Sequence, residues 1–257
     1  MSIDFDLTDG VAVITINRPE RRNALDAEHY QGLSDAWTRV RDDPGVRVAV
    51  IIGAGDKAFC AGADLKSWVG RDQELSELWL TQKGQLLNRG LEVWKPVIAA
   101  INGFCIGGGM TLMLATDVRV ASENAAFSLA EVKRGIIAAN GGTQRIMQQM
   151  PYCVAMEMLL TGDSIDAETA ARWGLVNRVV PLSDLMDAAL EMAGLIAANA
   201  PLALQAAKEL AVRSRDMSLA EGLRMEQMVN RILHHSEDTR EAKEAFAEKR
   251  KPDFKGK

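Results

Sequence analysis

The chain has 257 residues, of which 47% are hydrophobic and 25% charged, enough for one large buried core with or without a smaller subdomain. A formal net charge of -5 argues against nucleic acid as the main partner, although residues 248–257 are locally basic. Three cysteines without metal-type spacing (Cys60, Cys105 and Cys153) are expected as free thiols and small core residues in a reducing compartment. The N-terminus carries no secretory signal, so we expect a cytoplasmic protein.

Strands and helices are predicted to alternate over the first two-thirds of the chain. Strands are expected at 11–16, 46–52, 97–101 and 118–120, and helices at about 26–41 and 74–90. This alternation predicts an α/β protein whose largely parallel sheet is covered by helices. The nearly uncharged stretch 96–115 contains Asn102-Gly103 and three successive glycines. It is therefore predicted as a buried strand, a turn and a helix rather than a membrane span.

The pattern changes from about residue 166. Only 176–180 still has the pattern of a strand, and Ser218 and Glu221 form a capping-box signal for a later helix. The last ~60 residues are predicted to form a helical subdomain that packs on the core or on a neighbouring subunit. We therefore divide the chain into a core, 1–195, and a C-terminal helical oligomerisation region, 196–257.

Two short segments echo each other. Residues 59–64 (FCAGAD) and 104–109 (FCIGGG) each close an apolar run and open a predicted helix. Ala63 and Gly108 occupy equivalent positions, and helix-opening turns present unpaired backbone N–H groups. The pair predicts a two-amide site that stabilises a developing negative charge on oxygen. The alternative is that the glycines merely allow a strand and a helix to pack closely.

A base is needed beside such a site if it acidifies a carbon next to a carbonyl. Glu131 follows the predicted strand 118–120 and has apolar neighbours, and partial burial would raise its pKa and suit it to proton transfer. A solvated surface glutamate is the alternative. The three histidines lack ligand spacing, so no metal site is expected.

Five segments together resemble the crotonase (enoyl-CoA hydratase/isomerase) superfamily over nearly the whole chain. They are 23–26 (NALD), 57–66 (KAFCAGADLK), 96–103 (PVIAAING), 141–145 (GGTQR) and 248–251 (EKRK). The resemblance implies a crotonase-like spiral of ββα units with a C-terminal helical subdomain, assembled as a homotrimer or a dimer of trimers. It also implies an enzyme acting on acyl-CoA thioesters without metal or redox cofactor, coenzyme A being part of the substrate. No nucleic acid or membrane partner is expected.

The resemblance also assigns roles to individual residues. Ala63 and Gly108 match the residues whose N–H groups hold the thioester oxygen, and Glu131 matches the second of the two glutamates of enoyl-CoA hydratases. A further set falls in segments that line the coenzyme A pocket in the family: Ala24, Ala61, Asp64 and Leu65.

The chain departs from the hydratase pattern at two places. Thr111 stands where the first glutamate is expected, and a threonine can hydrogen-bond a water but cannot serve as its base. A single glutamate therefore favours an isomerase-like reaction through an enolate over efficient hydration. A hydratase proper, another reaction of the superfamily (hydrolase, decarboxylase or lyase), a non-catalytic CoA-ester binder and an oligomeric scaffold remain alternatives. Asn140 stands near the position of a family proline; it can position a water or a polar acyl group, or be an ordinary surface-loop residue.

Overall fold

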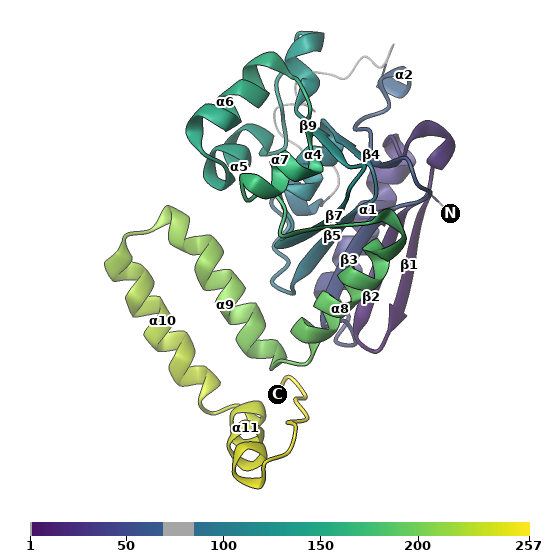
Figure 1. The fold of residues 1–257 in the computed structure, drawn as a ribbon. Helices are drawn as coiled ribbons and strands as arrows, with labels where there is room; N and C mark the ends of the chain where they lie inside the picture. The colour runs from purple at the N-terminus through teal and green to yellow at the C-terminus, as the bar shows by residue number, and fades with distance from the viewer. Residues whose placement is uncertain (1, 69–84) are drawn as a thin grey trace.

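The structure is a computed structural model that describes residues 2–68 and 85–257, without the side chains of Leu65 and Trp68 (Figure 1). Most of the predicted helix 74–90 lies outside the described residues, and its end contains the short 3-10 helix Leu87–Arg89. Helix α1 (Ala27–Asp42) follows the prediction closely, because the Asp26 carboxylate accepts hydrogen bonds from the Glu28 and His29 amides and so caps the first turn.

The larger sheet has six strands and is mostly parallel. In spatial order they are β1 (Ile3–Thr8), β2 (Val11–Ile16), β3 (Val48–Gly53), β5 (Val97–Ile101), β7 (Val118–Ser122) and β10 (Arg178–Val180). Only β1 runs antiparallel to its neighbour. The predicted strands are confirmed with shifts of one or two residues at several ends, whereas β1 was not predicted.

A second sheet of four short strands lies across the ends of the first. Its order is β4 (Ala58–Cys60), β6 (Phe104–Ile106), β8 (Ala126–Ser128) and β9 (Ile165–Asp166). Strands β4, β6 and β8 are parallel neighbours, as are β3, β5 and β7. Each successive unit therefore gives its first strand to the large sheet and its second strand to the small one. This is the predicted spiral of ββα units.

Helices complete each unit and cover the sheets. They are α1 (Ala27–Asp42), α2 (Leu65–Trp68), α4 (Gly108–Met113), α5 (Gly142–Gln149), α6 (Tyr152–Thr161), α7 (Ala167–Arg172) and α8 (Leu185–Ala197). Alternate residues of β3 and β5 face two separate cores. Val48, Val50 and Ile98 pack against α8, while Ala49 and Ile51 face the core shared with α1 and the small sheet. No single described helix is long and apolar enough to cross a membrane, although the bent pair Leu182–Ala197 and Pro201–Asp216 meets the length and composition test.

Three C-terminal helices extend away from the sheets (Figure 1). They are α9 (Pro201–Arg213), α10 (Leu219–Leu233) and α11 (Glu237–Glu248), and the predicted capping box of Ser218 and Glu221 is present at the start of α10. Neither α9 nor α10 contains a buried residue. The predicted division between residues 195 and 196 falls in the last turn of α8.

The cysteines are free, but the prediction that all three are core residues is wrong for one of them. Cys60 and Cys105 are buried and adjacent across β4 and β6, whereas Cys153 is exposed. It lies in the first turn of α6, and the mostly apolar sequence of this helix did not show which of its faces would be exposed.

Candidate active site

The two echoed turns meet where the small sheet ends. The parallel pairing of β4 with β6 places the turn before α2 beside the turn before α4. Gly62 has a φ of +93°, a left-handed conformation that favours glycine, and a Cβ built on it would lie 3.1 Å from the Gly108 nitrogen. A Cβ built on Gly108 would in turn lie 3.4 Å from the Ala63 nitrogen. The main chains of the two turns are therefore in direct contact.

The amides of Ala63 and Gly108 are both unused by the fold. The neighbouring groups are occupied, since Gly62 O accepts from Leu25 N at 2.8 Å, Asp64 N donates to Leu25 O at 2.8 Å, and Gly107 N donates to Ser128 O at 2.9 Å. Neither Ala63 N nor Gly108 N donates to another described residue. Two adjacent unpaired donors form a site suited to an oxygen that gains negative charge.

Glu131 lies over the second turn. It belongs to the 3-10 helix Ala130–Arg134, which follows β8, and its Oε1 would be 3.3 Å from a Cβ built on Gly107. Its Oε2 is buried and has no hydrogen-bond partner among the described residues. Burial raises the pKa of Glu131, while its own backbone hydrogen bond and the nearby Arg134 cation partly oppose this rise. A carboxyl group of this kind can take and return a proton near neutral pH.

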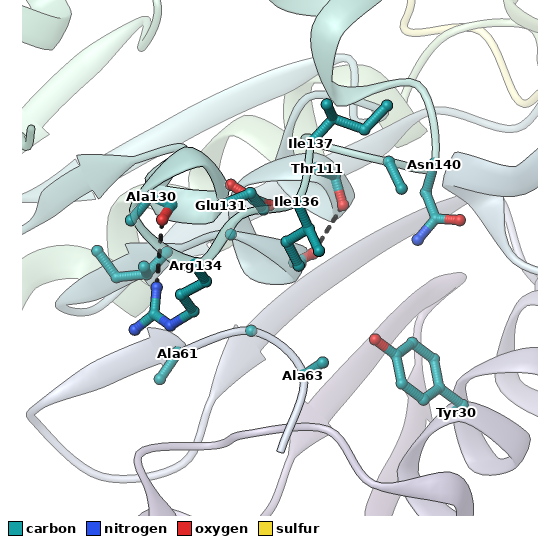
Figure 2. A pocket seen from close by; sticks show the side chains of 15 residues that line it. Tyr30, Ala61, Ala63, Thr111, Ala130, Glu131, Arg134, Ile136, Ile137 and Asn140 are labelled. Atoms are coloured by element: carbon teal, nitrogen blue, oxygen red, sulfur yellow. Dashed lines mark hydrogen bonds between the residues drawn. The ribbon is translucent and has the colours of Figure 1, made fainter. Parts of the chain in front are cut away.

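These groups share one cleft of about 180 Å³, which is partly open to solvent. Figure 2 shows Glu131, Thr111 and Asn140 on one side of it and Ala61, Ala63 and Tyr30 on the other. Six of the predicted site residues line this cleft: Ala61, Ala63, Gly108, Thr111, Glu131 and Asn140. Apart from Tyr30 and Arg134, the remaining lining residues are small or apolar, and Ile136 and Ile137 are exposed.

Thr111 lies in α4 and is only 1% exposed. Its hydroxyl donates to Gly108 O at 3.0 Å and accepts from Asn88 Nδ2 at 3.2 Å. The single proton of the hydroxyl is thereby committed to the helix backbone. Thr111 supports the turn that carries the Gly108 amide, and it places no second acid or base opposite Glu131.

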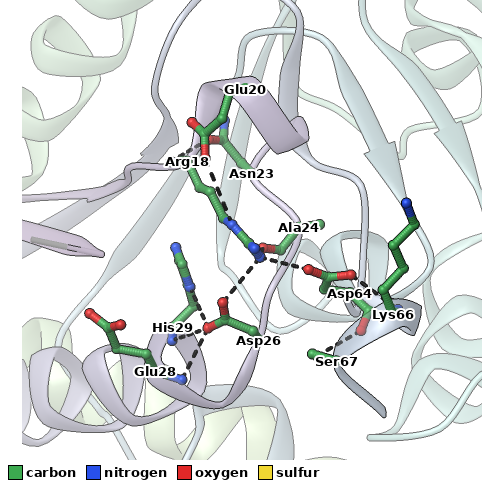
Figure 3. Close-up of polar contacts among 10 residues, drawn as sticks. All are labelled: Arg18, Glu20, Asn23, Ala24, Asp26, Glu28, His29, Asp64, Lys66 and Ser67. Carbon is green, nitrogen blue, oxygen red and sulfur yellow. Dashed lines mark hydrogen bonds and ion pairs between the residues drawn. The ribbon is translucent and has the colours of Figure 1, made fainter. Parts of the chain in front are cut away.

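Ala24 and Asp64 do not line this cleft, and the side chain of Leu65 is outside the described part of the chain. Leu65 begins α2, and Ala24 and Asp64 lie behind the first turn in a polar network centred on Arg18 (Figure 3). Arg18 Nη1 lies 2.9 Å from Asp64 Oδ2 and 3.2 Å from Asp26 Oδ2, and it donates to Ala24 O at 3.1 Å. One guanidinium thus ties the loop before α1 to the residue that follows Ala63.

Asn23 holds the same loop from the other side. Its side chain is fully buried, accepts from Arg18 N at 2.9 Å and donates to Ala54 O at 3.0 Å and Ala58 O at 2.7 Å. These bonds join the loop to both ends of the β3–β4 connection. The position of the Ala63 amide is therefore fixed by main-chain bonds on each side and by two polar side chains, the buried Asn23 and the partly buried Arg18.

Several cleft residues were not predicted: Tyr30, Arg134, Ile136 and Ile137. Tyr30 comes from α1, and its pKa is raised to about 12, chiefly by burial. Arg134 is exposed, donates only a long bond to Ala130 O at 3.3 Å, and forms no ion pair with another described residue. In the described part of the chain no group of three or more His, Cys, Asp or Glu side chains could hold a metal ion.

A spiral of ββα units with a cleft at two helix-opening turns defines a crotonase-type α/β protein, and comparisons agree. Residues 6–257 match the enoyl-CoA hydratase/isomerase family model. The chain is 44% identical to (E)-benzylidenesuccinyl-CoA hydratase of Thauera aromatica over 100% of both chains. It is 41% identical to carnitinyl-CoA dehydratase of Proteus mirabilis over 100% of this chain and 99% of that protein. The crystal structure of enoyl-CoA hydratase from Bacillus anthracis superposes with a TM-score of 0.92 at 37% identity, covering both chains completely. The chain belongs to the enoyl-CoA hydratase/isomerase family of the crotonase superfamily.

Proposed function

We propose that the chain is an acyl-CoA enzyme that holds the thioester oxygen of its substrate with the Ala63 and Gly108 amides and moves a proton with Glu131. The observation that carries this proposal is the meeting of two unpaired amides with a buried carboxylate oxygen that has no partner among the described residues. Removal of a proton from C2 of the acyl group places negative charge on the thioester oxygen, where the two amides stabilise it. Coenzyme A enters this chemistry only as part of the substrate.

Isomerisation of a 3-enoyl-CoA to the 2-enoyl-CoA is the reaction that this geometry supports best. Glu131 takes the C2 proton, which gives a dienolate held by the amides and a neutral carboxyl group. The same carboxyl group then returns the proton at C4, and the double bond moves into conjugation with the thioester. One acid/base group suffices for both steps, in agreement with the commitment of the Thr111 hydroxyl to Gly108 O.

Reversible addition of water to a 2-enoyl-CoA is the second candidate. Two relatives that are 44% and 41% identical over the full chain are named as a hydratase and a dehydratase of CoA esters. In that reaction Glu131 would serve both to deprotonate the water and to protonate C2, with the same two amides on the thioester oxygen.

The test gives the purified protein a 3-enoyl-CoA and a 2-enoyl-CoA in parallel and follows the absorbance of the conjugated thioester. Conjugation that appears from the 3-enoyl ester and falls by ~10²–10⁴ in rate in Glu131→Gln supports isomerisation. Loss of conjugation from the 2-enoyl ester supports hydration. Glu157→Gln, a matched change on the exposed surface of α6, should retain the rate. Equal rates for Glu131→Gln and Glu157→Gln would refute the role of Glu131.

We also propose that the protein is a homotrimer or a dimer of trimers in the cytoplasm. The absence of buried residues in α9 and α10 supports association, because Leu219, Leu223, Met228 and Ile232 leave apolar surface exposed there. Free thiols at all three cysteines suit a reducing compartment. Light scattering would give three or six times the chain mass of 28.0 kDa, and a mass of one chain would refute the assembly.

A further inference from the structure

The side chain of Asn140 has a fixed orientation in the wall of the cleft. Arg89 Nε donates to Asn140 Oδ1 at 2.9 Å. Because a guanidinium only donates hydrogen bonds, the amide oxygen must face Arg89 and the NH2 group must face away from it. Figure 2 shows that nitrogen pointing toward the side of the cleft on which Tyr30 lies. It donates to no other described residue, so the cleft receives a hydrogen-bond donor.

The backbone of Asn140 is held as firmly as its side chain. Its φ of +54° is in the left-handed region, which asparagine tolerates better than most residues. Its carbonyl accepts from Arg145 Nη1 at 2.9 Å, and the same nitrogen also donates to Asn88 O at 3.2 Å. The Arg89 guanidinium in turn lies 5.1 Å from the centre of the Tyr30 ring. Movement of the Asn140 donor would therefore break contacts on several sides.

Positive charge surrounds this donor. One guanidinium contacts the oxygen of the Asn140 side chain and another contacts its carbonyl. Among the described residues that line the cleft, the charged ones are Glu131 and Arg134. Two guanidinium groups in contact with the residue that carries the donor, together with Arg134 in the cleft wall, favour an anionic group on the substrate.

We infer that Asn140 is a specificity-determining residue that donates through Nδ2 to a free carboxylate on the acyl group of the substrate. The substrate class is thus an acyl-CoA ester whose acyl group carries a second carboxyl group. Arg89 and Arg145 are positioning residues, because they hold the Asn140 side chain and its main-chain carbonyl by hydrogen bonds and do not line the cleft. This inference rests on the proposed acyl-CoA function and specifies its substrate.

The test compares kcat/KM for two enoyl-CoA esters of equal chain length, one with a terminal methyl group and one with a terminal carboxylate. The wild-type protein should prefer the carboxylate. Asn140→Asp keeps the side-chain shape, tolerates the left-handed backbone and still accepts from Arg89, but it has no donor and repels an anion. The ratio of the two kcat/KM values should fall at least tenfold, which corresponds to about 1.4 kcal/mol. Asn140→Gly removes the donor without backbone strain and should lower the ratio in the same direction.

The ratio separates specificity from damage, because general disturbance of the cleft lowers both rates together. An unchanged ratio in both variants overturns the inference. The methyl ester of the carboxylate substrate is a further control. If Asn140→Asp lowers kcat/KM for this ester as much as for the free carboxylate, the inference is overturned, because an uncharged acceptor would then suffice. Failure of the proposed function would look different: wild type would turn over neither ester. In that case the dissociation constants of the saturated esters, with and without the carboxylate, still test Asn140, and equal constants in wild type and Asn140→Asp overturn the inference.

Discussion

Replacement of Gly62 by alanine tests whether the contact between the two turns sets the anion site. A Cβ on residue 62 would lie 3.0 Å from Ile106 O and 3.1 Å from the Gly108 nitrogen, closer than carbon normally approaches either atom. Both neighbours are main-chain atoms held in β6 and α4, so they cannot rotate away as a side chain would. The added methyl group should therefore move the Gly108 amide relative to the Ala63 amide.

The expected losses follow from the geometry. A left-handed φ costs an alanine about 1–2 kcal/mol, and overpacking a rigid contact costs about 1–3 kcal/mol more, so the free energy of unfolding should fall by about 2–5 kcal/mol. Displacement of one of two donors from a developing oxyanion costs about 10²–10³ in kcat. The fall should appear in kcat more than in KM, because the amides bind the transition state more strongly than the ground state.

Gly174→Ala is the matched control. Gly174 has a φ of +75°, similar in kind to that of Gly62, but a Cβ there would meet nothing within 4 Å. The free energy of unfolding of Gly174→Ala should fall by only the backbone cost of about 1–2 kcal/mol, and its turnover should be unchanged. Steady-state kinetics with a 3-enoyl-CoA and denaturant unfolding of both variants complete the assay. A kcat for Gly62→Ala within tenfold of that for Gly174→Ala would refute the assignment of the anion site to these turns.

Two further predictions concern Glu131 and Asn23. Burial raises the pKa of Glu131, so kcat/KM should rise with pH through a midpoint above the ordinary glutamate value of about 4.3. Arg134→Gln removes a cation that lowers this pKa and should move the midpoint to higher pH; a pH–rate profile that shifts downward would contradict the charge argument. The contribution of Glu131 to the free energy of unfolding should fall as pH rises through the same window, because the folded chain holds the Glu131 proton more tightly than the unfolded chain does. Asn23→Gly loses three hydrogen bonds, one of them buried and two partly buried, and should lower the free energy of unfolding by about 2–4 kcal/mol. The value for Asn23→Ala should be about 1 kcal/mol lower still, because φ at residue 23 is +55°. Denaturant titration measures the free energy of unfolding of both Asn23 variants. Equal midpoints for wild type and Asn23→Gly would show that these hydrogen bonds make no net contribution to stability.

The strands β2, β3, β5 and β7 of the large sheet were predictable because each is a mostly apolar run of five or six residues. Strand β1 was missed although Ile3, Phe5 and Leu7 alternate with polar residues, a signal that was available in the sequence. The small-sheet strands β6 and β8 have three residues each, too few for any periodicity to be measured. Their presence follows from the spiral and not from local pattern.

Part of the candidate site could be recognised from sequence because it is main chain in two repeated turns. The side chains that complete the cleft could not, since Tyr30 comes from α1 and Arg134 from a 3-10 helix much later in the chain. Their approach depends on the crossing of two sheets. Arg18 was missed for a related reason, because its role is visible only when the loop before α1 meets Asp64.

The anion site proposed for this protein consists of peptide groups. A mutation that changes a side chain does not remove a peptide N–H unless it introduces proline. Ala63 and Gly108 could therefore vary in identity while their hydrogen-bonding groups persist. Selection for a new acyl-CoA reaction can act on positions 111, 131 and 140 without rebuilding the means of stabilising the intermediate. A laboratory library confined to those three positions would search reaction type and acyl preference while the most demanding part of the catalyst is inherited intact.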